Sequence, residues 1–321
     1  MTYYEWKKLI INNYQKEKEN DMKQFGIRPI DDTTNTGKSL ICSNVFGTNN
    51  NNTLESIINS EEEVAIIVGF GGTGNLHLGH LLLSNELKYY LTNIKHPKFY
   101  FVNFEINYDI EILNQMKILS ESANKHMKYE IIDYNNLDVL KLKRKISQFL
   151  NINTVNRVMG WKNEKMQSYE KMLDMLTTFS LGSILQEKHS LILIDINQKT
   201  YYALYKQIEN KINKNLTCFV YHILFPSLKS PIERMSIKKS KSLIYLTDSY
   251  DKIESKLKKS YSGMENKEAT CSFLRVADLV LSENDMTILI NDCIKNINIC
   301  NTCKNVNAEI ISKKIIKRRV W

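Results

Sequence analysis

The sequence predicts an α/β fold in which helices cover both faces of a parallel sheet, with a small helical domain behind it. Two observations carry this prediction. Short apolar runs of strand type recur along the chain with helical patterns between them, an alternation that is typical of parallel sheets. After about residue 250 no further convincing strand-type run follows, and the pattern is helical.

The first 60 residues are expected to form an N-terminal extension of helix and loop. Residues 5–24 have the charged pattern of an exposed helix. Residues 31–60 are punctuated by Thr, Asn, Gly and Ser and contain four consecutive asparagines at 49–52. Such a composition predicts a loop or an insertion. We therefore set residues 1–60 apart from the sheet.

The sheet is expected within residues 61–249. Its first strand is the continuous apolar run VAIIV at 64–68, which is of the fully buried type. A helix follows, because Leu83, Leu87 and Tyr90 recur at helical spacing. Further strand-type runs are FYFV (99–102), LILIDI (191–196), CFVYHI (218–223) and LIYL (243–246).

The helical domain is expected at residues 250–321. Thr247, Asp248 and Ser249 form a good N-cap cluster, and the pattern that follows is helical as far as Gly263. The sequence therefore predicts a change of architecture at this point.

Bulk properties narrow the class of protein. A net charge of +9 and a pI of about 9.0 favour polyanion partners such as nucleic acid, although a Lys-, Ile- and Asn-rich composition can arise without one. The sequence has no run of about 18 apolar residues, so it predicts no transmembrane helix. The N-terminus also lacks the apolar region of a secretory signal. We expect a cytoplasmic protein with reduced thiols and no membrane partner.

The clearest chemical signal is TGNLHLGHLLLSNEL at 73–87. His77 and His80 stand at the opening of the expected helix, where backbone N–H groups attract phosphate. Histidines in that turn can donate to a phosphate that gains charge in a transition state, and Gly79 would let an adenine ring approach the backbone. Two surface histidines at a helix start are the alternative. A G-x-G-x-x-G match in 69–74 is weak alone, because its expected downstream acidic residue is not clearly placed.

In this setting HLGH resembles the HIGH signature of class I aminoacyl-tRNA synthetases. RMSIKKSKSLIYLTDS at 234–249 resembles their second signature, the KMSKS loop, in its tryptophanyl form. LFPSLK (224–229), SYSG (260–263) and QFGIRPI (24–30) resemble the same branch. The resemblance covers nearly the whole chain and is weakest between about 105 and 150. It implies a Rossmann-type activating domain, a trimmed anticodon-binding-like domain and a homodimer.

The resemblance also implies a reaction: ATP-dependent activation of an amino-acid carboxylate, with tRNA as the acceptor and Mg²⁺ accompanying ATP. The catalytic residues that it implies are His77, His80, Arg234 and Lys238. The ATP-binding residues that it implies are Gly71, Thr73, Gly74, Gly79, Met235 and Ser236. Arg234 stands where the family has lysine, so the charge is kept but the geometry changes.

The implied amino-acid pocket departs from the family at three positions. Asn197 precedes Gln198 where relatives have an Asp-Gln motif, and an amide binds an ammonium group less strongly than a carboxylate does. Lys229 replaces a side-chain amide and cannot accept from an indole N–H, while Ile66 replaces a tyrosine. The expected substrate is therefore tryptophan or a related aromatic amino acid. A paralogue that activates an unusual amino acid is the alternative, and a non-catalytic tRNA-binding protein is the third.

Four cysteines near the end of the chain follow the spacing C-x21-C-x6-C-x2-C: Cys271, Cys293, Cys300 and Cys303. Four thiolates at one centre would hold zinc or an iron–sulfur cluster. The spacing resembles the [4Fe–4S] motif of a subset of bacterial tryptophanyl-tRNA synthetases, with a first gap one residue shorter. Zinc and a set of buried, metal-free cysteines are the alternatives. KKIIKRRVW at 313–321 holds five basic residues that would suit a phosphate backbone.

Overall fold

The computed structural model describes residues 1–70, 75–103, 110–160, 166–212, 216–235, 243–262, 270–295 and 300–318. These residues form a seven-stranded sheet in the order β1-β2-β7-β6-β3-β4-β5. Its strands are β1 (Arg28–Pro29), β2 (Val45–Thr48), β3 (Val64–Phe70), β4 (Pro97–Asn103), β5 (Tyr129–Ile132), β6 (His189–Asp195) and β7 (Leu216–His222).

The five strands from β7 to β5 run parallel, whereas β2 pairs antiparallel with β7 and β1 pairs antiparallel with β2. β3 is the middle one of these five parallel strands, and the chain proceeds first to β4 on one side and later to β6 on the other. The predicted α/β class and parallel sheet are confirmed. The order reverses between β3 and β6, which is where open α/β sheets bind ligands.

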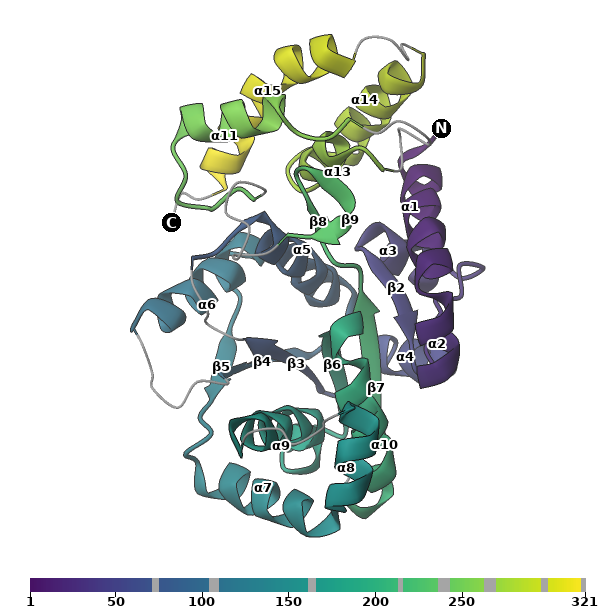
Figure 1. Ribbon diagram of the computed structural model, residues 1–321, viewed down its shortest axis with the longest axis vertical. Coiled ribbons are helices and arrows are strands. Elements are labelled where there is room, and N and C mark those ends of the chain that lie inside the picture. Colours follow the sequence, from purple (N-terminus) through teal and green to yellow (C-terminus); the bar gives the residue numbers. More distant parts are fainter. Residues whose placement is uncertain are drawn as a thin grey trace.

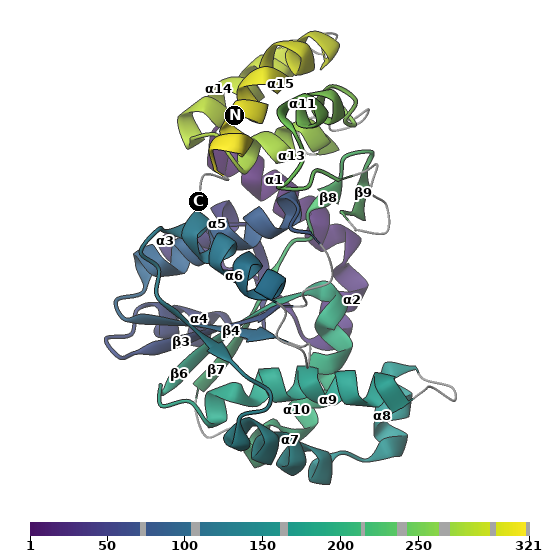
Figure 2. The ribbon, with the colours of Figure 1, turned by 90° about the vertical axis from the view of Figure 1, so that its left-hand side faces the viewer.

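Helices cover both faces of the sheet, as Figures 1 and 2 show. α5 (Leu78–Asn93) and α6 (Ile110–Ala123) lie together on one face, while α7 (Leu137–Phe149), α8 (Ile152–Met159), α9 (Met166–Ser180) and α10 (Lys199–Ile212) pack together on the other. This two-sided cover explains the continuous apolar run of β3, because both faces of a central parallel strand are removed from water.

Residues 31–60 differ from the predicted loop. They contain α3 (Asn35–Cys42), β2 and α4 (Asn51–Ile58). The asparagine run starts a helix, because the Asn50 side chain accepts the Thr53 N–H at 3.2 Å and so caps α4. Val45 and Phe46 are fully buried, which is why β2 extends the sheet.

The run LIYL (243–246) was expected to form a strand and does not. Tyr245 makes an isolated antiparallel bridge with His77. Leu78 N–H donates to Ile244 O at 3.0 Å, and Leu246 N–H donates to Leu76 O at 2.8 Å. The run is apolar because it is buried against the start of α5, and it finds only this short segment as a partner.

The described residues beyond 250 are helical where they form regular structure, as α11 (Tyr250–Lys258), α13 (Ser272–Asp278), α14 (Glu283–Lys295) and α15 (Cys300–Lys317). A hairpin of β8 (Pro226–Ser227) and β9 (Ser230–Arg234) lies between them and the sheet (Figure 1). The N-terminal helices are α1 (Tyr3–Glu17) and α2 (Glu19–Phe25), and α1 packs against both α3 and α14. No helix in the described ranges has the length and apolarity to cross a membrane.

Candidate active site

A cavity of about 440 Å³ opens at the carboxyl ends of β3, β6 and β7, beside the start of α5. Five polar side chains and one methionine line it: His77, His80, Asp195, Gln198, His222 and Met235. The cavity therefore lies at the reversal of strand order, with the positive end of a helix dipole beside it.

His77 and His80 are joined by the cap of α5. His77 is the N-cap residue, and its Nδ1 accepts the Gly79 N–H at 3.1 Å. The Nδ1 of His80 accepts the His77 N–H, also at 3.1 Å. Each Nδ1 is thus an acceptor, which leaves the ring proton of a neutral imidazole on Nε2.

Both imidazoles are neutral at neutral pH. Burial, with the neighbouring His80 as a second cause, lowers the pKa of His77 to about 3. Burial lowers the pKa of His80 to about 4. The pair therefore lines the cavity without carrying charge, and each ring has its N–H on Nε2.

The ring of His77 leaves no room for a side chain at position 79. A Cβ at this position would lie 2.8 Å from His77 Cε1 and 2.9 Å from His77 Nδ1. Any larger residue would displace the imidazole, so the cap itself requires glycine here.

Asp195 and Gln198 reach the cavity, whereas Asn197 does not. Asp195 ends β6, and its carboxylate accepts the Asn197 N–H at 2.6 Å while Gln198 Oε1 accepts the Asp195 N–H at 3.2 Å. Asn197 is exposed in the short 3₁₀ turn Ile196–Gln198. The carboxylate that the sequence lacks at 197 is present two residues earlier.

The other expected site residues are distributed as follows. Met235 is buried on the cavity wall, and its N–H donates to Phe225 O at 2.8 Å. Ile66 is fully buried in the middle of β3, and Lys229 is exposed at the tip of the β8–β9 hairpin, so neither lines the cavity. Arg234 ends β9. Gly71, Thr73, Gly74, Ser236 and Lys238 lie outside the described residues.

Two cavity residues, Asp195 and His222, were not predicted. Both are the last residues of their strands, and they are register partners on the adjacent strands β6 and β7. The available signal was a polar residue at the end of each apolar run, at the edge of the sheet where ligands bind.

Solved structures resemble the chain over nearly its whole length. The tryptophanyl-tRNA synthetase of the archaeon Aeropyrum pernix matches with a TM-score of 0.72 at 16% identity, over 94% of this chain and 92% of that one. The tryptophanyl-tRNA synthetase of Giardia lamblia matches with 0.74 at 16%, over 96% and 94%. The tyrosyl-tRNA synthetase of Aeropyrum pernix matches with 0.67 at 13%, over 89% and 95%.

The fold is that of class I aminoacyl-tRNA synthetases. No family model and no curated protein matches the sequence. At such low identity the likeness establishes the synthetase fold and leaves the substrate to be argued from the site.

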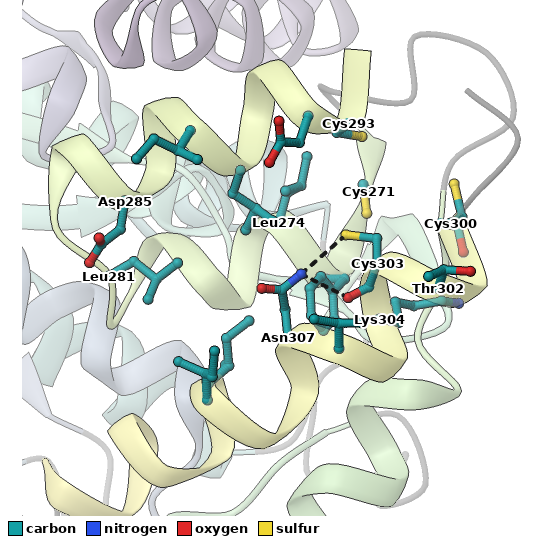
Figure 3. Close-up of a pocket in the computed structure, with 18 of the residues that line it drawn as sticks. Cys271, Leu274, Leu281, Asp285, Cys293, Cys300, Thr302, Cys303, Lys304 and Asn307 are labelled. Carbon is teal, nitrogen blue, oxygen red and sulfur yellow. Dashed lines mark hydrogen bonds between the residues drawn. The ribbon is translucent and has the colours of Figure 1, made fainter. Parts of the chain in front are cut away.

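The helical end of this synthetase fold contains a second cavity, of about 610 Å³, which all four C-terminal cysteines line. Figure 3 shows them gathered at one end of it, with Leu281 and Asp285 at the other. Burial, and to a lesser degree the Cys303 and Cys300 thiols, raises the pKa of Cys271 to about 11.

The thiols share this cavity but do not form a metal site as they stand. Among the described residues no three His, Cys, Asp or Glu side chains are grouped so that they could hold a metal ion. Residues 296–299, between Cys293 and Cys300, lie outside the described ranges. The donor set of four thiols suits zinc or an iron–sulfur cluster chemically, but in the described residues these thiols are not grouped closely enough to hold either one.

Proposed function

We propose that the protein is an ATP-dependent amino acid–tRNA ligase. It would join an amino acid to AMP, release pyrophosphate and pass the aminoacyl group to tRNA. The observation that carries this proposal is the pair of neutral imidazoles, His77 and His80, which cap α5 and line the cavity at the reversal of strand order in a synthetase fold.

In this reaction an oxygen of the amino-acid carboxylate attacks the α-phosphorus of ATP, and the bond to the pyrophosphate oxygen breaks. The protein contributes positioning and charge stabilisation. His77 and His80 would donate to phosphate oxygens, with the start of α5 adding its dipole. Arg234 and Lys238 would offset the charge on the leaving pyrophosphate.

The remaining ATP contacts are proposed from the same resemblance. Gly79 and Met235 would flank the adenine, in keeping with their places at the cavity. Gly71, Thr73, Gly74 and Ser236 would contact the nucleotide, and Mg²⁺ would arrive with ATP, since magnesium is usually bound through substrate phosphates.

For the amino acid we propose Asp195 and Gln198 as the residues that receive its ammonium group. An aromatic, tryptophan-like side chain is the first candidate substrate. Because Lys229 and Ile66 lie away from the cavity, they do not argue for or against tryptophan. A paralogue that activates an unusual amino acid for a specialised pathway is the alternative.

We further propose a division of labour along the chain. Residues 61–249 would activate the amino acid, residues 250–321 would contact tRNA as an anticodon-binding-like domain, and residues 1–60 would pack against both. The net charge of +9 and the basic residues of α15 support a tRNA partner. A cytoplasmic homodimer is the proposed working form.

A second proposal concerns the cysteine cavity. Cys271, Cys293, Cys300 and Cys303 would hold a [4Fe–4S] cluster, with zinc as the alternative. The support is that all four thiols of the motif line one cavity. Such a group would order this end of the molecule and take no part in the activation chemistry.

The test of the main proposal is amino-acid-dependent formation of AMP from ATP, measured with and without tRNA. Formation of aminoacyl-tRNA would support the ligase. Activation without transfer to any tRNA would favour the specialised paralogue. Tight tRNA binding without any activation would leave only the non-catalytic alternative.

A further inference from the structure

A carboxyl group lies buried behind the wall of the cavity. Glu86, in the third turn of α5, has no solvent exposure. Its Oε1 accepts the hydroxyl of Tyr90 at 3.1 Å, and its Oε2 lies 3.4 Å from Nδ1 of His222. In the described part of the chain neither Oε2 nor this Nδ1 makes a hydrogen bond, so the two buried atoms face each other without any other partner.

His222 lies between the buried Glu86 and the cavity. Its Nδ1 faces Glu86 in the interior while the residue also lines the cavity, from which we infer that the opposite, Nε2 edge of the ring faces the cavity. On the adjacent strand its register partner is Asp195, whose carboxylate also lines the cavity. Neighbouring strands lie about 4.8 Å apart, so an imidazole and a carboxylate stand side by side at one mouth.

Burial determines the protonation states of Glu86 and His222. Burial raises the pKa of Glu86 to about 8, against the opposing hydrogen bond from Tyr90. Burial lowers the pKa of His222, which Asp195 partly offsets. At neutral pH the carboxyl is protonated, so its O–H can donate to Nδ1 and the ring proton then sits on Nε2.

Resting on the proposed function, we propose that His222 is a substrate-binding residue and Glu86 its positioning residue. The Nε2–H of His222 donates a hydrogen bond to the carboxylate of the amino acid, and the ammonium group of the same amino acid lies against Asp195. A donor beside a carboxylate matches the two ends of an amino-acid head group, and Glu86 holds His222 in the tautomer that donates.

This arrangement predicts a pH dependence with a definite sign. As pH rises through about 8, Glu86 loses its proton, and its oxygen then accepts from Nδ1–H. The ring proton moves from the cavity side, and Nε2 becomes an acceptor that repels a carboxylate. The KM for the amino acid therefore rises above pH 8. In Glu86→Gln the amide N–H₂ donates to Nδ1 at every pH, so this rise disappears.

The experiment compares four variants of the full chain by amino-acid-dependent pyrophosphate exchange and by direct binding. His222→Phe removes the donor and should raise the amino-acid KM about tenfold or more, the usual loss for a hydrogen bond to a charged group, while the KM for ATP stays unchanged. His222→Gln retains an N–H donor and should recover part of the loss. His189→Phe alters a histidine paired with Glu62 (Nε2 to Oε2 3.2 Å) at the opposite end of β6, and should leave both constants unchanged.

Direct binding supplies a readout that does not depend on turnover. Wild type should bind an amino acid more tightly than the matching amine without a carboxylate, and His222→Phe should lose most of that preference. Circular dichroism establishes that each variant is folded, and the near-isosteric His222→Gln and Glu86→Gln keep the test open if His222→Phe does not fold.

Each outcome of these experiments supports or overturns a named part of the inference. Unchanged amino-acid KM and unchanged carboxylate preference in His222→Phe, with an active wild type, would overturn this inference and leave the proposed function standing. An unaltered pH profile in Glu86→Gln would overturn the role of Glu86. Wild type that neither binds nor activates any amino acid would overturn both the inference and the proposed function.

Discussion

The rings of His77 and His80 lie 4.1 Å apart, centroid to centroid, and the Nδ1 of His80 accepts the backbone N–H of His77. The two histidines thus form the N-terminal cap of α5 with their own side chains. Because each Nδ1 accepts a backbone N–H, the ring proton of each neutral imidazole lies on Nε2. One local motif therefore begins the helix and also sets the tautomer of both imidazoles.

Removing one of these donors should lower the rate of activation and not the stability of the helix. His77→Asn keeps a side-chain oxygen that can cap α5 but removes the imidazole. We expect pyrophosphate exchange to fall about 100- to 1000-fold, the loss measured for a single transition-state donor. His96→Asn, at an exposed position before β4, is the matched control. Equal activity in both variants would exclude His77 from the chemistry.

Asp195 should determine the affinity for the amino acid. Asp195→Asn retains the acceptor for the Asn197 N–H and removes only the charge. Because a hydrogen bond to a charged group contributes about 1.5–3 kcal/mol, the amino-acid KM should rise about 10- to 100-fold with little change in kcat. If Asn197→Ala produced that rise and Asp195→Asn did not, the ammonium site would be at 197 as the motif first implied.

A buried ion pair should fasten α1 to α13. Lys7 Nζ lies 2.7 Å from Asp278 Oδ2 and 2.5 Å from Asn44 Oδ1, and both charged side chains are nearly inaccessible. Lys7→Met leaves the Asp278 carboxylate buried, so the free energy of unfolding should fall by about 3–5 kcal/mol. Urea unfolding measures this loss.

The neighbouring Lys8 provides the control for that measurement, because its ion pair with Asp32 is solvent-exposed. Lys8→Met should change the unfolding midpoint far less, since exposed pairs contribute little. Equal shifts for the two variants would show that burial of the Lys7 pair does not matter.

The cysteine cavity makes a prediction about metal content. Protein purified without oxygen should contain about four iron atoms per chain if the cluster forms, and Cys271→Ser should lose them. Cys218→Ser is the control, because this buried thiol bonds with Thr48 and Asn49 in the sheet region. Protein with one tightly held zinc ion would favour zinc over the cluster, and metal-free protein would exclude both zinc and the cluster.

The sequence predicted the interior of the fold better than its margins. The continuous apolar runs identified β3, β4, β6 and β7 because central parallel strands are buried on both faces. β1, β2 and β5 were missed, because β1 has only two residues and neither VFGT nor YEII is a continuous apolar run. The run at 243–246 was misassigned, because apolarity reports burial and does not reveal whether a partner strand is present.

The site divided in the same way. His77, Gly79 and His80 were found because their spacing is local and belongs to one helix turn. Asp195 was missed because the short 3₁₀ turn after β6 decides which of Asp195 and Asn197 faces the cavity, and a linear motif does not contain that rotation. His222 and Glu86 meet only through the packing of α5 on the sheet, 136 positions apart in the chain (222 − 86).

The central claim is tested most directly by exchange of labelled pyrophosphate into ATP across a panel of amino acids. The account predicts exchange that depends on one amino acid, or a few related ones, and that is lost in the His77→Asn, His80→Gln double variant. Absence of exchange with every amino acid in folded wild-type protein, or full exchange in the double variant, would contradict it.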